Sequence, residues 1–437
     1  MRLSVITMAL VICSLNACDS PSTTKDPDAS YFVKFYGRDG DQEGKDVVIL
    51  PDGNMVLFGT SRPTQPTLAT QWYVVKVDPK GNVFWEKEFG GLLDDEARDI
   101  ELTSTGNLVL VGNTYKTSTD RDILIITINT DGTKLDSARI PVRDALDPFG
   151  GSSDGDEDVA SVSEALDGGF LIAGTTTYVA NKPNPTFLPD PHDALKVRVD
   201  ASLDVFPSSW VQNYGYVSDD ASQKIVQVSA TKFYVFGYTN TLPPGQTTQN
   251  YNFWVYELGV DGDFVNQSLY PGTPSAEEKL SSFSFSPTLA APDYFLGGLT
   301  RTGSGPSDFY VTKLRNPLEF NSNDIQFEKS LSINLGTGLE GHTAVAAALG
   351  GGFLVMGNEN GFDNNQNWVL TKLFANGTEA WNIPIVFGGE GFDTCGAIQQ
   401  LPDGRIILVG TMRTGRPDVG EFKLTLVKVN AEGKLQN

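Results

Sequence analysis

Residues 44–91 are GKDVVILPDGNMVLFGTSRPTQPTLATQWYVVKVDPKGNVFWEKEFGG, and this stretch decides the fold. It contains four short runs rich in β-branched and aromatic residues, a composition typical of β-strands. The runs are 47–50, 54–60, 72–77 and 83–89. Turn sequences, Pro51-Asp52-Gly53 and Asp78-Pro79-Lys80-Gly81, join the first run to the second and the third to the fourth. Proline presets φ, aspartate bonds nearby backbone and glycine adopts positive φ. The stretch therefore predicts a unit of four antiparallel strands, named a, b, c and d in chain order.

This unit recurs to the C-terminus, and a glycine in strand b marks its register. The glycines are Gly59, Gly112, Gly174, Gly237, Gly297, Gly357 and Gly410. Their spacing is 53 to 63 residues. A regular period of four-stranded units is typical of β-propellers. The chain is therefore predicted to be all-β, a single seven-bladed β-propeller of four-stranded blades over residues 31–437.

The last unit lacks its fourth strand, and a matching strand stands alone before the first unit. Residues 32–37 (FVKFYG) compare with residues 84–90 (FWEKEFG) of the first unit. We expect 32–36 to complete the last blade by pairing with the strand at 424–429. This pairing would close the ring and remove its two exposed edges.

The N-terminal segment is predicted to be a targeting signal. Arg2 precedes a short apolar run at 3–15, which is too short to cross a membrane as a helix. The sequence Leu15-Asn16-Ala17-Cys18 resembles the lipobox of bacterial lipoproteins. That resemblance implies a signal peptide at 1–17, cleavage before Cys18, and acylation of its thiol, for example with palmitate. The alternatives are an ordinary secretory signal in which the cysteine is coincidental, and an uncleaved anchor.

Residues 18–30 would then be a flexible tether, because they are rich in Pro, Ser, Thr and Asp and cannot bury a core. The expected partner of acylated Cys18 is a lipid bilayer of the bacterial cell envelope, the outer membrane rather than the inner. The net charge of -22 argues against a nucleic-acid partner.

Because the sequence has only three cysteines and two histidines, it predicts neither a disulfide bond nor a zinc site. Cys395 is the only cysteine left once the signal and the lipidated residue are set aside, and we expect it to be a small buried residue rather than a nucleophile. His192 and His342 lie in different units, whereas a zinc site needs three or four convergent ligands. No cofactor is predicted.

Acidic residues recur just before strand a, and they form the candidate face for a ligand or cation. They are Asp41, Glu43, Asp94, Asp95, Asp154, Asp156, Asp158, Asp219, Asp220, Glu277, Glu340 and Asp393. The link from strand d to the next strand a lies at the same end of a propeller as the b–c loops. Four of those loops are long, at 61–71, 178–193, 240–252 and 359–367. Function on a rigid scaffold usually resides in such loops.

Two interpretations of this acidic face stay open. Asp154, Asp156 and Asp158 are the densest set and the best calcium candidate, although they do not follow the D-x-[DN]-x-[DN]-G pattern. The other interpretation is a solvated acidic rim whose carboxylates accept hydrogen bonds from strand-a amides.

The segment from Asp78 to Trp85 resembles the tryptophan-docking turn of quinoprotein propellers, and 375–381 is a looser copy. The whole chain is similar to bacterial secreted propeller-repeat lipoproteins. The resemblance implies the fold only. Quinoprotein dehydrogenases have eight blades, a vicinal disulfide and a calcium-bound quinone, whereas this chain has seven units and only Cys395 in the predicted propeller. Repeated tryptophans at Trp72, Trp254 and Trp368 are expected to pack between blades.

No recognisable catalytic motif appears in the sequence. The leading hypothesis is a membrane-anchored, non-catalytic binding or scaffold propeller whose partner is an envelope protein or a glycan. The alternative is a glycan-active enzyme with carboxylates at the mouth of the funnel. A deep pocket with two or three acids and an aromatic residue favours the enzyme, and a flat acidic face favours binding.

Overall fold

We describe a computed structural model of the protein. It describes residues 31–65, 67–117, 120–140, 142, 156–177, 192–206, 210–214, 219–240, 250–270, 276–286, 293–303, 305, 307–315, 325–331, 339–360, 365–389, 391–415 and 420–436. The predicted signal, the tether and Cys18 lie outside these residues, as do Asp154 and most of the expected loops 178–193 and 240–252.

The strands form seven antiparallel blades of four strands each, as predicted. The first blade contains β2 (Asp41–Ile49), β3 (Met55–Arg62), β4 (Gln71–Val77) and β5 (Val83–Phe89), the second β6 (Asp95–Leu102), β7 (Leu108–Thr117), β8 (Asp120–Ile128) and β9 (Lys134–Ile140), and the third β10 (Glu157–Glu164), β11 (Phe170–Thr176), β12 (Asp193–Val199) and β13 (Gln212–Tyr214). The fourth contains β14 (Ala221–Ser229), β15 (Lys232–Thr239), β16 (Asn252–Leu258) and β17 (Phe264–Tyr270), and the fifth β18 (Ala276–Ser286), β19 (Asp293–Thr302), β20 (Ser307–Leu314) and β21 (Ile325–Leu331). The sixth contains β22 (Leu339–Ala347), β23 (Phe353–Asn360), β24 (Gln366–Leu373) and β25 (Ile385–Phe387), and the seventh β26 (Thr394–Gln400), β27 (Ile406–Thr414), β28 (Glu421–Val429) and β1 (Phe32–Tyr36).

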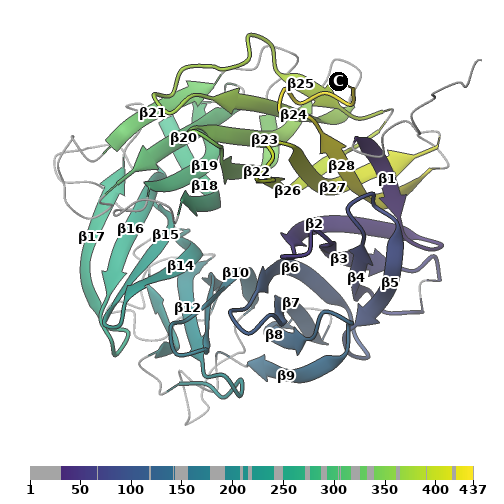
Figure 1. Ribbon diagram of the computed structural model, residues 1–437. Coiled ribbons are helices and arrows are strands. Elements are labelled where there is room, and N and C mark those ends of the chain that lie inside the picture. Colours follow the sequence, from purple (N-terminus) through teal and green to yellow (C-terminus); the bar gives the residue numbers. More distant parts are fainter. Residues whose placement is uncertain are drawn as a thin grey trace, which may run out of the picture.

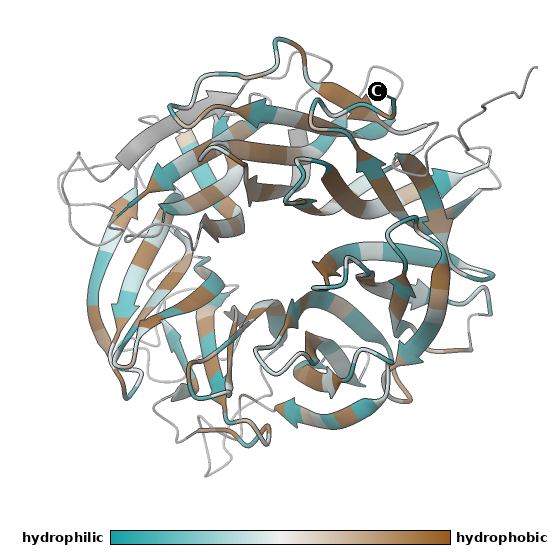
Figure 2. Cartoon of the chain, in the orientation of Figure 1, coloured by the Kyte–Doolittle hydropathy of each residue, from teal (hydrophilic) through white to brown (hydrophobic). Residues whose placement is uncertain are grey.

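The blades stand around a central opening, and the first strand of each blade lines it (Figure 1). Hydrophobic residues lie along the strands, while the connecting turns are mostly hydrophilic (Figure 2). The core is divided into clusters between blades, such as the one that joins Val48 and Phe58 of the first blade to Ala97 and Leu110 of the second. Both faces of a middle strand are therefore buried, which explains why these strands are apolar without alternation.

The ring is closed by the N-terminal strand, which confirms the predicted topology. β1 pairs antiparallel with β28, from Phe32 opposite Lys428 to Tyr36 opposite Leu424. The Tyr36 hydroxyl also donates a hydrogen bond of 2.9 Å to the carbonyl of Gly81 in the first blade. Strands from the two ends of the chain thus share one blade.

The strand-b glycine is explained by a β-bulge in strand a. In the second blade the register shifts between Ala97 and Asp99, and Ala97 pairs with Gly112. A Cβ on Gly112 would lie 2.1 Å from the carbonyl oxygen of Glu96 and 2.9 Å from the Trp72 ring of the preceding blade. Any side chain here would collide with backbone, so glycine is required for steric reasons.

The fifth blade corrects one residue of the predicted register. The sequence pattern indicated Gly297, but Gly298 pairs with Leu280 just before the bulge, and Gly297 pairs with Ser282 just after it. A Cβ on Gly298 would lie 2.0 Å from the carbonyl oxygen of Lys279, a contact with strand a that recurs in five other blades. Two successive glycines made the two registers indistinguishable in the sequence.

The residue after the glycine joins neighbouring blades. Four seams carry a hydrogen bond from a strand-a amide to this side chain in the preceding blade. The bonds are Ala97 N to Thr60 Oγ1 (3.0 Å), Val159 N to Asn113 Oδ1 (3.3 Å), Cys395 N to Asn358 Oδ1 (2.6 Å) and Gly44 N to Thr411 Oγ1 (3.0 Å). We call this the clasp position. The side chain at this position accepts a hydrogen bond from the strand-a amide that the bulge removes from pairing within the sheet.

At the opposite end of the ring, aromatic residues of the outer strands contact the next blade. The Trp85 indole donates to the carbonyl of Thr130 at 3.3 Å and lies against Gly132. The ring of Trp381, which precedes β25, lies against Gly433, and Phe32 of β1 lies against Gly81. Trp72, Trp254 and Trp368 are buried, as expected for blade packing. Among the described residues, no helix has the length and apolar character needed to cross a membrane.

The glycine contact predicts a sharp difference between two substitutions. Gly112→Ala should lower the free energy of unfolding by about 1–3 kcal/mol or more, because the new methyl group overlaps a carbonyl and a buried indole. Gly91→Ala is the control, since its Cβ would meet nothing closer than 3.9 Å and its φ is not positive. Denaturant unfolding of both variants measures the difference. Equal stabilities would contradict the proposed role of the bulge.

Candidate functional site

Half of the acidic residues expected before strand a belong to strand a itself, which corrects the predicted boundary. β2 begins at Asp41 rather than at residue 47, and β6, β10, β18 and β22 likewise start within their acidic segments. Successive side chains of a strand point to opposite sides. The acids therefore divide into a buried set and a set that faces the mouth of the channel.

The buried set occupies one equivalent position in every blade, four residues before the strand-a residue that pairs with the position preceding the strand-b glycine. We call it the buried polar ring, and its described side chains are at most 1% exposed: Gln42, Asp95, Glu157, Asp220, Glu278 and Asp393. Glu340 holds this position in β22, although its side chain lies outside the described part of the structure. Asp95 accepts a hydrogen bond from Gly91 N at 2.6 Å, and Asp393 accepts one from Gly389 N at 2.9 Å. These carboxyls hold the links between blades and are not available to a ligand.

Two other predicted residues accept hydrogen bonds from backbone amides of neighbouring segments. Asp94 accepts a hydrogen bond from Thr70 N at 2.7 Å, and Asp41 accepts one from Phe422 N at 2.9 Å across the ring closure. These acids accept backbone hydrogen bonds, but not from the strand-a amides that the interpretation named. The donors lie in links between blades, just before β4 and in β28.

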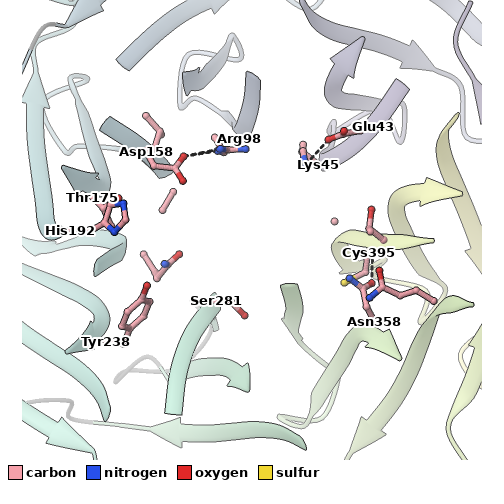
Figure 3. Close-up of a pocket in the computed structure, with 16 residues that line it drawn as sticks. Glu43, Lys45, Arg98, Asp158, Thr175, His192, Tyr238, Ser281, Asn358 and Cys395 are labelled. Atoms are coloured by element: carbon pink, nitrogen blue, oxygen red, sulfur yellow. Dashed lines mark hydrogen bonds and ion pairs between the residues drawn. The ribbon is translucent and has the colours of Figure 1, made fainter. Parts of the chain in front are cut away.

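A cavity of about 750 Å³ opens at the end of the channel where the b–c loops lie. Every blade contributes to its lining, which includes Glu43, Lys45, Arg98, Asp158, Thr175, His192, Gln223, Tyr238, Ser281, Asn358, Gln366, Thr394 and Cys395. Figure 3 shows these side chains around a central opening. We call this cavity the mouth. It lies at the end that the sequence predicted for function.

The mouth carboxylates are paired with cations rather than left as a free acidic face. Glu43 lies 3.0 Å from Lys45 and 3.3 Å from Arg62, and Asp158 lies 2.8 Å from Arg98. Further ion pairs join these into one row of four acids and four bases across three blades. The row is Lys45, Glu43, Arg62, Glu96, Arg98, Asp158, Arg121 and Asp156. This side of the mouth is therefore nearly neutral and rigidly arranged.

The electrostatics of Glu43 follow from this row. Burial by itself would raise the pKa of Glu43, but the cations Lys45 and Arg62 outweigh burial and lower it. The carboxylate thus stays ionised at neutral pH and accepts hydrogen bonds. It is unsuited to donate a proton as a general acid.

The other side of the mouth is built from tyrosines. Asp219 accepts from the Tyr251 hydroxyl at 3.2 Å and lies 3.1 Å from Nδ1 of His192. Tyr251 meets Tyr238 edge to face, with ring centroids 5.7 Å apart. A second cavity of about 460 Å³ adjoins the mouth here, and Gln223, Tyr238 and Ser281 line both.

The channel continues into a deeper cavity of about 420 Å³ whose charged residues the sequence reasoning missed. Asp46, Asp99 and Lys224 line it, and the two carboxyls are hydrogen-bonded to each other. Burial and then the neighbouring Asp99 raise the pKa of Asp46 well above its usual range. Asp99 accepts from Lys224 Nζ at 3.3 Å and from Val162 N at 2.8 Å.

These residues share one signal that alignment of the repeats could have revealed. Each stands two places after the residue that pairs with the strand-b glycine, beyond the bulge. Ser282 holds the same position in the fifth blade and also accepts a strand-a amide of the next blade, from Val345 at 2.9 Å. The position therefore has a structural role in several blades.

The described residues provide no cluster of ligands for the predicted calcium site. Asp156 is bound by Arg121 at 2.6 Å and Asp158 by Arg98 at 2.8 Å, while Asp154 lies outside the described part. Within that part, no group of three His, Cys, Asp or Glu residues could hold a metal ion. Cys395 is buried, as expected, and burial raises the pKa of its thiol to about 12, so it is not a ready nucleophile.

Comparison with known proteins gives a fold and no family. No protein-family profile and no curated protein matches the sequence. Among solved structures, the GH93 α-L-arabinofuranosidase of Fusarium graminearum in complex with arabinobiose is 10% identical, with 92% of this chain and 98% of that chain covered and a TM-score of 0.50. A PL25 ulvan lyase bound to an oligosaccharide is 8% identical (92% and 97% covered, TM-score 0.50), and Drosophila Semaphorin 1a is 9% identical (92% and 88% covered, TM-score 0.51). The propeller thus resembles glycan-active enzymes in fold, and the semaphorin shows that this likeness alone selects no activity.

Glu157 of the buried polar ring predicts a pH dependence of stability. Burial raises the pKa of Glu157 to about 8, and three nearby carboxylates, Asp122, Asp120 and Asp156, act in the same direction. The hydrogen bond from Thr176 acts in the opposite direction but is outweighed. An unfolded chain loses this proton above about pH 4.5, so unfolding releases a proton between about pH 4.5 and 8. Stability conferred by this group therefore falls as pH rises through that window, by up to about 1.4 kcal/mol per pH unit.

Glu157→Gln removes this contribution. The variant should gain stability relative to the parent protein as pH rises from 5 to 8, measured by denaturant unfolding at several pH values. Glu88→Gln, at an exposed position, is the control and should follow the parent curve. A constant difference between Glu157→Gln and the parent across the window would refute the prediction.

Proposed function

We propose that the protein is a non-catalytic glycan-binding propeller whose binding site is the mouth. The observation that carries this proposal is the composition of the mouth: a cavity of about 750 Å³ lined by all seven blades with paired charges, amides, hydroxyls and a tyrosine. Sugar hydroxyls both donate and accept hydrogen bonds, and such a lining offers both kinds of partner in fixed positions. Ligand pockets of 300–1,000 Å³ are the usual size for small ligands.

A glycan fits the mouth better than a protein partner does. Stable protein interfaces have an apolar core depleted of charged residues. The mouth is lined instead by Glu43, Lys45, Arg98 and Asp158. Tyr238 supplies one partly exposed ring on which a sugar face can pack.

The pocket meets the criterion of two acids and an aromatic residue that favours an enzyme, but the state of the acids favours binding. Glu43 and Asp158 are both held by cations, and the lowered pKa of Glu43 opposes proton donation. Glycoside hydrolysis requires one carboxyl that donates a proton and a second that stays ionised. The mouth supplies acceptors without the donor.

A glycan-active enzyme is the second candidate, and the hydrogen-bonded pair Asp46 and Asp99 favours it. A carboxyl with a raised pKa can donate a proton in acid–base catalysis, and the carboxyl of Asp46 has this property where it is hydrogen-bonded to Asp99. The same carboxyls accept backbone hydrogen bonds from Ile100 and Val162 of neighbouring blades, which gives them a structural role. Binding therefore stands first.

Gln223 provides the test of glycan binding, because its side chain lines all three cavities. Glycans retained on an array would be titrated by calorimetry. Gln223→Ala should weaken the affinity about tenfold, through the loss of one or two hydrogen bonds. Gln227→Ala, in the same strand but outside the cavities, should leave it within about twofold.

Absence of binding to any glycan would refute the proposal. Formation of new reducing ends in the same mixtures, abolished by Asp99→Asn, would establish the enzyme instead. Unchanged affinity of Gln223→Ala beside measurable glycan binding would place the ligand elsewhere on the ring.

We also propose that acylated Cys18 anchors the propeller to the bacterial envelope, at the outer rather than the inner membrane. The support is the sequence Leu15-Asn16-Ala17-Cys18 after a short apolar run. A lipoprotein cysteine carries several acyl chains, and two or more chains give stable anchoring.

Fractionation of expressing cells tests the anchor. Cys18→Ala should move most of the protein from the membrane pellet to the soluble fraction, and Cys395→Ala is the matched control because that cysteine is buried in the propeller. Retention of Cys18→Ala in the pellet would reject the lipid anchor.

A further inference from the structure

One position in the fifth blade reverses the charge found elsewhere in the repeat. The residue just before the partner of the strand-b glycine is an acid in three blades, Glu43, Glu96 and Asp158. In the fifth blade the same position is Lys279, next to Leu280. Blades that only had to close the ring would not need a base in place of an acid at this position. We therefore regard the change to Lys279 as a local specialisation of the mouth.

Lys279 differs from the other basic residues that line the cavities. Lys45, Arg98, His192, Lys224 and Arg301 each lie within 4 Å of a carboxylate, at 3.0, 2.8, 3.1, 3.3 and 2.8 Å. Among the described residues, the Lys279 ammonium has no such partner. It lies instead over two tyrosine rings, 3.8 Å from the centroid of Tyr251 and 5.4 Å from that of Tyr238. An ammonium held on aromatic faces keeps donors free for an anion.

The same place departs from the clasp between blades. Tyr238 and Leu299 occupy the clasp position in the fourth and fifth blades, where Thr or Asn stands in the five others. Neither side chain can supply the amide or short hydroxyl acceptor used at those seams. Both residues line the cavity of about 460 Å³, together with Tyr251, Glu277, Lys279 and Arg301. The loss of the clasp and this side cavity therefore coincide.

We propose that the side cavity binds one acidic sugar residue of the glycan, with its carboxylate or sulfate ester on Lys279. This inference rests on the proposed glycan-binding function and adds the chemical class of the ligand. Arg301 stands beside the site with one amine bound to Glu277 at 2.8 Å and its remaining donors uncommitted to that contact. The sugar ring would pack on Tyr238, which lines both the side cavity and the mouth.

The net charge of -22 sets a limit on this ligand. A densely charged polyanion would be repelled by the molecule as a whole. A single acid group is affected mainly by charges within a Debye length, about 8 Å at physiological salt. The site therefore suits an isolated or terminal acidic residue on an otherwise neutral chain.

Calorimetry with matched oligosaccharides tests the inference on the full chain. The probes are a neutral galactan oligosaccharide, the same oligosaccharide ending in a galacturonate, the methyl ester of that galacturonate, and a terminally sulfated form. The galacturonate or sulfate form should bind at least about tenfold more tightly than its neutral counterparts. The preference should shrink on raising the salt concentration. Comparison of the two acidic probes identifies which acid the site prefers.

Lys279→Gln should abolish this preference, so that the acidic and neutral probes bind the variant with equal affinity. Lys232→Gln, whose lysine pairs with Glu257 and lines none of these cavities, is the matched control and should keep the preference. Equal binding of acidic and neutral probes by the parent chain, or a preference that survives in Lys279→Gln, would overturn the inference and leave glycan binding in place. Failure to bind any probe or array glycan would overturn both.

Discussion

The contact between the strand-b glycine and a strand-a carbonyl is the constraint on which the rest of the ring depends. Cβ atoms on Gly59, Gly112 and Gly237 would lie 1.9, 2.1 and 1.8 Å from the carbonyl oxygens of Glu43, Glu96 and Ala221. This close approach accompanies a bulge, which leaves one residue of strand a outside the ladder. At four seams the amide beside the bulge bonds to the preceding blade instead. A local irregularity within each blade thus becomes the joint between blades.

The same bulge builds the channel lining. A regular strand presents every second side chain to one side. At the bulge two consecutive residues line the deeper cavity, as Lys45 with Asp46, Arg98 with Asp99 and Gln223 with Lys224. Each blade can therefore contribute adjacent side chains to the ring interior. The site residues follow directly from the steric requirement that fixes the fold.

Charge in this protein is used in three different environments. In the buried polar ring, Asp95 and Asp393 accept hydrogen bonds from the links between blades, and burial raises the pKa of Asp95, Glu157 and Asp393. Acids of the mouth pair with arginine and lysine, so a strongly acidic sequence presents a nearly neutral row there. The reversal at Lys279 stands out against this background. Departures from the repeat thus indicate where the propeller became specialised.

The sequence by itself determined the fold class, the count of seven blades and the closure by residues 32–36. These follow from local turn chemistry and from a glycine that steric contact requires in every copy. The pattern selected Gly297 in place of Gly298 only because the two glycines are adjacent. The sequence also predicted function at one end of the ring, and the mouth opens at that end. Only the tertiary structure decided the state of the acids, because burial and ion pairing depend on residues about sixty positions apart. Asp95 and Asp158 look alike in sequence, yet the first accepts a link amide and the second an arginine of another blade. Likewise, Asp46, Asp99 and Lys224 meet only when the ring closes around them.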